Sequence, residues 1–198
     1  RLKRYEEAIE SYNRTIELDD PTSYALLRIG KCHEKLGNKV LALKFYNKTV
    51  HEDPLLDKGW IAITDFYVRQ KNFQKALYYV NKALSIDNEN RFYWKRYATI
   101  NKEMNFFEEA EYGYRKAVEY GDYMLDTWLF WVDILQFLGE FESAIQTLLQ
   151  ASEYFPEEYE IEYRLAGLNL MLHETEKGKF HLSNALRLNF KNHMLLEH

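Results

Sequence analysis

Small residues recur along this chain at one fixed interval. The six positions are Ala8, Ala42, Ala76, Ala110, Ala144 and Gly178. Self-similarity with a period of roughly 20 to 50 residues is the signature of stacked repeat proteins, because each repeat is one structural unit that buries its apolar face against its neighbours. The regular spacing therefore predicts a stacked repeat protein.

The residues around each small anchor repeat in phase with it. Four and then seven residues later come Tyr12, Tyr46, Val80, Tyr114, Leu148 and Leu182, and Thr15, Thr49, Ala83, Ala117, Ala151 and Ala185. Offsets of zero, four and seven lie on one face of an α-helix. A second apolar pair precedes the anchors from Ala42 to Ala144 at a constant offset, as Trp128 and Trp131 precede Ala144. Each unit is therefore predicted to be two amphipathic helices of about 13 residues, packed closely where the anchor has no bulk.

Turn and break residues set the predicted boundaries. Left-handed turns are expected at Gly37-Asn38, Lys71-Asn72, Asn105 and Gly139, and breaks between units at Asp53-Pro54 and Phe155-Pro156. The predicted organisation is one array over residues 1–192, with a partial repeat at 1–22, repeats at 23–56, 57–90, 91–124, 125–158 and 159–192, and a tail at 193–198. The tail includes Leu196-Glu197-His198, which resembles the start of a purification tag. Because apolar residues occur at both ends of the array, we expect the natural array to continue beyond it.

In these features the chain resembles the tetratricopeptide repeat family. The second unit matches the family pattern with Leu26, Ile29-Gly30, Gly37, Ala42, Tyr46 and Pro54, and the fifth with Trp128, Trp131, Gly139, Phe141, Ala144, Ala151 and Pro156. The sixth departs from it, since Glu162 replaces the large apolar residue and Gly178 the alanine. The resemblance implies an all-α fold, a right-handed α-solenoid of stacked antiparallel helix pairs with a 34-residue period. It also implies a non-enzymatic protein-binding role.

Composition excludes some classes of function. No apolar run reaches the roughly 18 residues that a membrane span needs, so direct membrane insertion is not expected. The net charge of −5 opposes the phosphate neutralisation that nucleic-acid binding requires, and an RNA-binding helical repeat is therefore the weakest alternative. A single cysteine, Cys32, leaves no internal disulfide, which fits a reducing compartment such as the cytoplasm without fixing the compartment.

Catalytic and metal-binding patterns are not expected. Cys32 and His33 are adjacent, so on a helix their side chains point about 100° apart and do not form a nucleophile and base. His173 and His181 lack the spacing of a zinc motif and are predicted to be solvated. We therefore expect no enzyme activity, no cofactor and no metal.

The expected binding surface is the concave groove that the first helices of successive units line in the resembled family. Its predicted residues are Tyr24, Leu27, Lys31, Lys35, Lys58, Ile61, Asp65, Arg69, Phe92, Lys95, Lys102, Asp126, Leu129, Asp133, Phe137 and Tyr163. Basic residues predominate in the second to fourth units, whereas the last two units are expected to contribute only acids, so the groove is predicted to be electrically bipolar. The lysine, asparagine and arginine cluster with which some members grip a C-terminal carboxylate is not reproduced.

Two functions are favoured over RNA binding. The first is a scaffold that binds a peptide or a partner's helix in the groove, because apolar groove residues would otherwise stay partly exposed to water. The alternative is a self-association or regulatory assembly module that acts through its uncapped ends, which would make the protein a homo-oligomer. Both functions make the partner a protein or a peptide.

Overall fold

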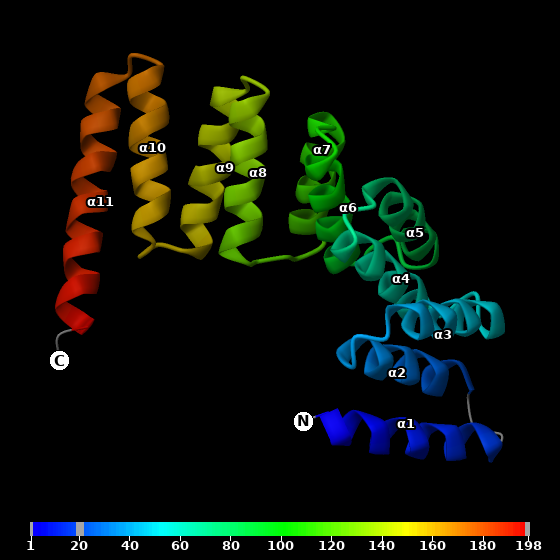
Figure 1. Cartoon of the computed structure of the whole chain (residues 1–198). Helices are drawn as coiled ribbons and strands as arrows, with labels where there is room; N and C mark the ends of the chain where they lie inside the picture. The colour runs from blue at the N-terminus through cyan, green and yellow to red at the C-terminus, as the bar shows by residue number, and fades with distance from the viewer. Residues whose placement is uncertain (1, 19–21, 197–198) are drawn as a thin grey trace. The chain divides into compact units, whose positions relative to one another are not determined.

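The computed structural model describes residues 2–18 and 22–196, and within these ranges every regular element is an α-helix. The helices are α1 (Leu2–Glu17), α2 (Thr22–Lys35), α3 (Lys39–Glu52), α4 (Asp57–Arg69), α5 (Phe73–Ile86), α6 (Arg91–Glu103), α7 (Phe107–Glu119), α8 (Leu125–Phe137), α9 (Phe141–Tyr154), α10 (Tyr159–Met171) and α11 (Thr175–Leu196). Neighbouring helices such as α10 and α11 run antiparallel (Figure 1). The predicted all-α fold of helix pairs is confirmed.

The helices form two compact units. Unit 1 comprises residues 1–105 with α1 to α6, and unit 2 comprises residues 106–198 with α7 to α11. The division falls inside the predicted repeat 91–124, and α11 runs through the boundary expected at residue 193. The division of the array into repeats stays a prediction.

The turns within the helix pairs use one backbone conformation at one interval. Gly37, Lys71, Asn105, Gly139 and His173 all have φ between 56° and 80°, and they recur with the same spacing as the small anchors. This is the left-handed region, which glycine and asparagine adopt readily, histidine less often and lysine rarely. The period of the sequence is therefore present in the backbone itself, even where the side chain is unfavourable.

The small anchors of four repeats are fully buried. Ala42, Ala76, Ala110 and Ala144 are all 0% exposed. The residues four positions later fill the adjoining core in the same four repeats, with Tyr46, Val80, Tyr114 and Leu148 at most 1% exposed. The equivalent expectation for Leu182 is wrong, because this side chain is 36% exposed.

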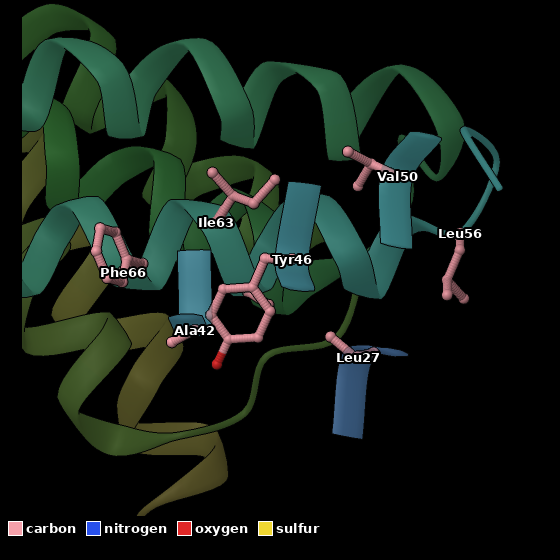
Figure 2. Close-up of a cluster of buried hydrophobic side chains, with 8 residues drawn as sticks. Leu27, Ala42, Tyr46, Val50, Leu56, Ile63 and Phe66 are labelled. Carbon is pink, nitrogen blue, oxygen red and sulfur yellow. The ribbon is translucent and has the colours of Figure 1, made fainter. Parts of the chain in front are cut away.

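In unit 1 the core surrounds Tyr46. The cluster consists of Leu27, Ala42, Tyr46, Val50, Leu56, Ala62, Ile63 and Phe66, most of which Figure 2 labels. A Cβ atom added to Gly30 would lie 2.6 Å from the Tyr46 ring, so the glycine is required for the close contact between α2 and α3. Tyr46 also donates a hydrogen bond from its hydroxyl to Glu34 over 3.0 Å.

In two helix pairs the large apolar residue of the first helix is a tryptophan whose indole N–H donates a hydrogen bond to the preceding loop. Trp60 Nε1 donates to the carbonyl oxygen of Pro54 at 2.9 Å, and Trp94 Nε1 donates to that of Asn88 at 2.7 Å. Glu162 occupies the equivalent position in the last pair.

Glu162 contacts α11 instead. Its Oε2 atom lies 2.8 Å from His181 Nδ1 and accepts a hydrogen bond from Asn184 Nδ2 at 3.3 Å. The expectation that His181 is solvated is therefore wrong, since its side chain is only 15% exposed.

Candidate functional site

The predicted groove residues lie on α2, α4, α6, α8 and α10, the first helices of the pairs. We call their accessible surface the first-helix face of each unit. Those exposed are Tyr24, Lys31, Lys35, Lys58, Arg69, Phe92, Asp126, Phe137 and Tyr163, and those partly buried are Ile61, Asp65, Lys95, Lys102, Leu129 and Asp133. The expected exposure of Leu27 is wrong: it is 2% exposed, because it packs in the same cluster as Leu56 and Ile63. Leu27 is therefore removed from the candidate surface.

Charged side chains on the first-helix face of unit 1 pair across successive helices. Arg69 of α4 donates to Glu34 of α2, and Arg96 Nε of α6 lies 2.8 Å from Asp65 Oδ1 of α4. Burial raises the pKa of the Asp65 carboxyl above its ordinary value, and the positive charges of Arg96 and Arg69 oppose that shift. Three successive first helices are thus linked by ion pairs, which reduces the charge available to a partner.

The same arrangement recurs in unit 2. Arg164 of α10 donates to Asp133 of α8, and its Nε also donates to Glu160 at 2.8 Å. Burial acts to lower the pKa of Arg164, but the hydrogen bonds to both carboxylates outweigh it and raise the pKa. The expectation that the last two pairs contribute only acids is wrong, because Arg164 lies among them and balances Asp133 and Glu160.

Sequence reasoning missed both arginines because it treated each first helix separately. Arg96 follows Asp65 at the same interval as Arg164 follows Asp133, and the interval is a little shorter than one repeat. An acid and an arginine related in this way lie on adjacent first helices, so this interval could have identified them.

The two units nevertheless carry net charges of opposite sign. The sequence of unit 1 has 19 Lys and Arg against 14 Asp and Glu, a net charge of +5, and that of unit 2 has 7 against 17, a net charge of −10. A field of one sign over a unit steers the approach of an oppositely charged partner. The charge difference is therefore a property of each whole unit, and it is not confined to the groove residues from which a bipolar groove was predicted.

A hollow of about 530 Å³ opens on the first-helix face of unit 2. It is lined by Gln136, Glu160, Tyr163, Arg164, Ala166, Gly167, Leu168, Leu170, Met171 and Leu182. Tyr163 and Met171 are each 60% exposed and Leu170 is 44% exposed. A Cβ atom on Gly167 would meet no atom within 4 Å, so the absence of a side chain there leaves the floor of the hollow open.

Another exposed aromatic residue lies on α8. Phe137 is 68% exposed, and its ring centroid lies 3.9 Å from that of Phe107 on α7. The contact holds the ring in place while leaving most of it accessible. Rigid exposed aromatic rings are typical anchors of protein interfaces, because they bury much apolar area at little cost in conformational entropy.

The groups that could suggest catalysis are arranged for packing. Cys32 is buried, and burial raises the pKa of its thiol, which disfavours the thiolate needed by a nucleophile. His33 stacks on Phe45 with ring centroids 5.3 Å apart, and burial lowers the pKa of its imidazole. In the part of the chain that the structure describes, no group of three or more His, Cys, Asp or Glu side chains is placed to hold a metal ion. Nor do these residues include a helix long and apolar enough to cross a membrane.

Comparison with known proteins identifies similar chains. The family model described as the tetratricopeptide repeat matches residues 1–56. ER membrane protein complex subunit 2 of Xenopus tropicalis is 22% identical over 111 residues, which are 56% of this chain and 37% of that protein. The human protein O-mannosyl-transferase TMTC1 is 24% identical over 172 residues, 84% of this chain and 19% of that protein. The chain therefore spans well under half the length of these relatives.

Solved structures extend the likeness in fold over most of the chain. YrrB, a TPR protein with an unusual peptide-binding site, superposes with a TM-score of 0.74 at 19% identity, covering 94% of this chain and 96% of that one. MamA superposes with a TM-score of 0.75 at 14% identity, covering 87% and 94% respectively. At these identities the comparison establishes the fold and not the ligand.

Proposed function

We propose that the chain is a non-enzymatic scaffold that binds a peptide or a partner's helix on its first-helix face, because residues 1–56 match the tetratricopeptide repeat model and the fold is similar to that of the TPR protein YrrB. Proteins of this family generally mediate protein–protein interaction. The observation that carries the proposal is the open hollow at Gly167 in unit 2, where an accessible apolar surface surrounds a position with no side chain.

The chemistry of the hollow suits a segment with apolar and basic residues. Tyr163 and Met171 offer apolar contact area, and methionine adapts its shape to different partners. The net charge of −10 on unit 2 attracts a basic partner and repels an acidic one. An apolar side chain of the partner inserted above Gly167 would replace the side chain that the helix lacks.

The test begins with peptides selected on the immobilised chain from a random displayed library. Selected peptides are titrated against the wild type, Tyr163→Ala, Met171→Ala and Gly167→Leu. Each variant is expected to weaken binding by about tenfold or more if the hollow holds an apolar anchor. Leu149→Ala is the matched control, because Leu149 is 45% exposed on α9 and does not line the hollow. Equal losses for Leu149→Ala and Met171→Ala would move the site elsewhere.

Self-association remains a second candidate because α11 exposes an apolar surface. Phe180, Leu186 and Phe190 are between 62% and 68% exposed, and patches of this kind usually mark an interface. Light scattering over a range of protein concentrations separates the two candidates. A mass that stays that of one chain rejects self-association, and a larger mass that Leu186→Lys reduces to one chain supports it.

A further inference from the structure

Unit 1 has a second hollow that the predicted groove does not include. It measures about 880 Å³ and is lined by Lys39, Val40, Leu43, Lys44, Asn47, Lys48 and His51 of α3, by Phe66 of α4 and by Gln70, which directly follows α4. None of the sixteen predicted groove residues lines it. The hollow is therefore a separate surface, built mainly on the second helix of its pair.

The lining residues of α3 form one stripe of that helix. Val40, Leu43, Asn47 and His51 follow the three-and-four spacing that places side chains on one helical face. The packed face of α3 is a different stripe, formed by Ala42, Tyr46, Thr49 and Val50, all of which are buried. Val40 is 83% exposed. The core therefore uses one face of α3 and leaves the other accessible.

Lysines flank this stripe. Lys39, Lys44 and Lys48 are exposed, and the described residues that line the hollow include no aspartate or glutamate. Lys39 Nζ donates to Gln70 Oε1 at 3.4 Å, and Lys48 Nζ lies 5.6 Å from the centre of the Phe45 ring. Neither contact neutralises the ammonium group. Unit 1 as a whole carries a net charge of +5, which adds to the local attraction for an anionic partner.

The spacing of the lysines indicates the conformation of the partner. Lys44 and Lys48 are four residues apart, which places their side chains on one side of α3 and about 6 Å apart along its axis, whereas Lys39 lies on a different side of the helix. An extended chain advances about 6.6 Å every two residues, and its alternate side chains point to opposite sides. Two acidic residues at alternate positions of an extended segment would therefore meet Lys44 and Lys48. The intervening side chains would point away from them, toward the α4 side of the hollow.

The apolar part of the lining favours a peptide over a nucleic acid. Val40 and Leu43 give the hollow an apolar contact surface, which suits Val or Leu side chains of a partner. Single-stranded nucleic acids instead require exposed aromatic rings on which bases stack. Phe66 is only 7% exposed, so it offers little ring surface for stacking.

We propose that the hollow between α3 and α4 is a second protein-docking site, which binds an extended acidic segment with apolar residues at alternate positions. The chain would then hold two different protein segments, one on the first-helix face of unit 2 and one on α3. The two sites differ in the charge they select.

The probe is a fluorescent peptide of alternating Glu and Val about seven residues long, and its control replaces every Glu with Gln. Fluorescence anisotropy measures its binding to the wild type and to Lys44→Glu/Lys48→Glu. The double variant is expected to weaken binding by about tenfold or more, because like charges then face the glutamates. Raising the salt from about 50 mM to about 500 mM should weaken binding to the wild type for the same reason.

The matched control is Lys75→Glu/Lys82→Glu, which makes the same change in net charge on α5, away from the hollow. It should leave binding within about twofold, and Tyr163→Ala should leave it unchanged, because the first-helix site is separate. Circular dichroism of each variant checks that it is folded. Val40→Gln removes the apolar contact without a charge change and should also weaken binding.

Four results would overturn the assignment. They are undetectable peptide binding, equal losses in the two double variants, binding of the Gln control as tight as that of the Glu peptide, and displacement of the peptide by a second copy of the chain. Tighter binding of oligouridylate than of the peptide, lost in Lys44→Glu/Lys48→Glu, would reassign the hollow to nucleic acid.

Discussion

Gly178 of α11 faces Ala166 of α10 with no room for another methyl group: a Cβ atom on Gly178 would lie 3.3 Å from the carbonyl oxygen of Ala166 and 2.6 Å from Leu170 Cγ. In the pair α2–α3 the two residue types are exchanged, with Gly30 on the first helix and Ala42 on the second. A Cβ atom on Gly30 would lie 3.3 Å from the carbonyl oxygen of Ala42. Each close contact thus has one glycine and one alanine. The departure of Gly178 from the repeat pattern is compensated by Ala166.

Adding a methyl group at Gly178 should destabilise unit 2. We expect Gly178→Ala to lower the free energy of unfolding by about 1–3 kcal/mol, because Leu170 and the α10 backbone must move to admit it. Gly167→Ala is the control on α10, where a Cβ atom meets open space. That change should raise stability by up to about 1 kcal/mol, since alanine favours the helix. Urea unfolding measures both, and a Gly178→Ala variant as stable as the wild type would contradict the close contact.

Overpacking at an alanine anchor should have a similar effect. Ala110 is 0% exposed, so Ala110→Leu is expected to cost about 1–3 kcal/mol or more, because three additional carbon atoms enter a filled space. Gln150→Leu, at an exposed position of α9, should change stability by less than about 0.5 kcal/mol. Thermal melts followed by circular dichroism distinguish these outcomes. Similar melting temperatures for the two variants would mean that Ala110 does not lie at a tight contact.

The ion pair between Asp65 and Arg96 gives a pH-dependent prediction. Burial already raises the pKa of Asp65 above its unfolded value of 3.8, so its contribution to stability is present below that pH and is lost as the pH rises through the folded pKa. Arg96→Met removes the opposing positive charge and raises that pKa further. The variant should therefore lose more stability relative to the wild type at pH 7 than at pH 4.

A double variant isolates the carboxylate in that experiment. Asp65→Asn/Arg96→Met has no ionisable group at either position, so the additional pH dependence should disappear. Urea unfolding of all three proteins at both pH values measures the effect. A stability difference between Arg96→Met and the wild type that is constant with pH would show that Arg96 acts through packing alone.

Much of the fold was predictable because it depends on local periodicity. The small anchor at Ala42 or Ala76 and its partners at fixed offsets specify which face of a helix is buried, and the left-handed turns at Gly37 and Gly139 follow from their residue type. His173 adopts the same left-handed turn, which its residue type alone did not specify. It follows Gly139 at the same interval at which Gly139 follows Asn105, so the repeat period indicates the turn where the residue type does not.

The candidate site was less predictable because accessibility depends on neighbouring helices. Leu27 and Tyr163 occupy equivalent positions in the second and sixth predicted repeats, yet Leu27 is 2% exposed and Tyr163 is 60% exposed. Helical periodicity places both on the same face, but only the distance to adjacent elements decides whether the face is covered. The arginines at 96 and 164 were missed for a related reason, since a long side chain reaches an acid on the preceding first helix.

Recognition on the first-helix face of unit 1 should depend on the charges of α6. Lys95→Glu/Lys102→Glu is expected to weaken the binding of an acidic segment selected on the chain by about tenfold and to reduce the salt dependence of that binding, because two favourable interactions become repulsive. Lys75→Glu/Lys82→Glu on the second helix α5 again provides the charge-matched control.

In unit 2, Phe137→Ala should raise the dissociation rate of a segment bound there, since most effects of a lost apolar anchor appear in that rate. Surface plasmon resonance at two salt concentrations measures all three variants, and equal losses from the α6 and α5 double variants would place the binding surface outside the first-helix face.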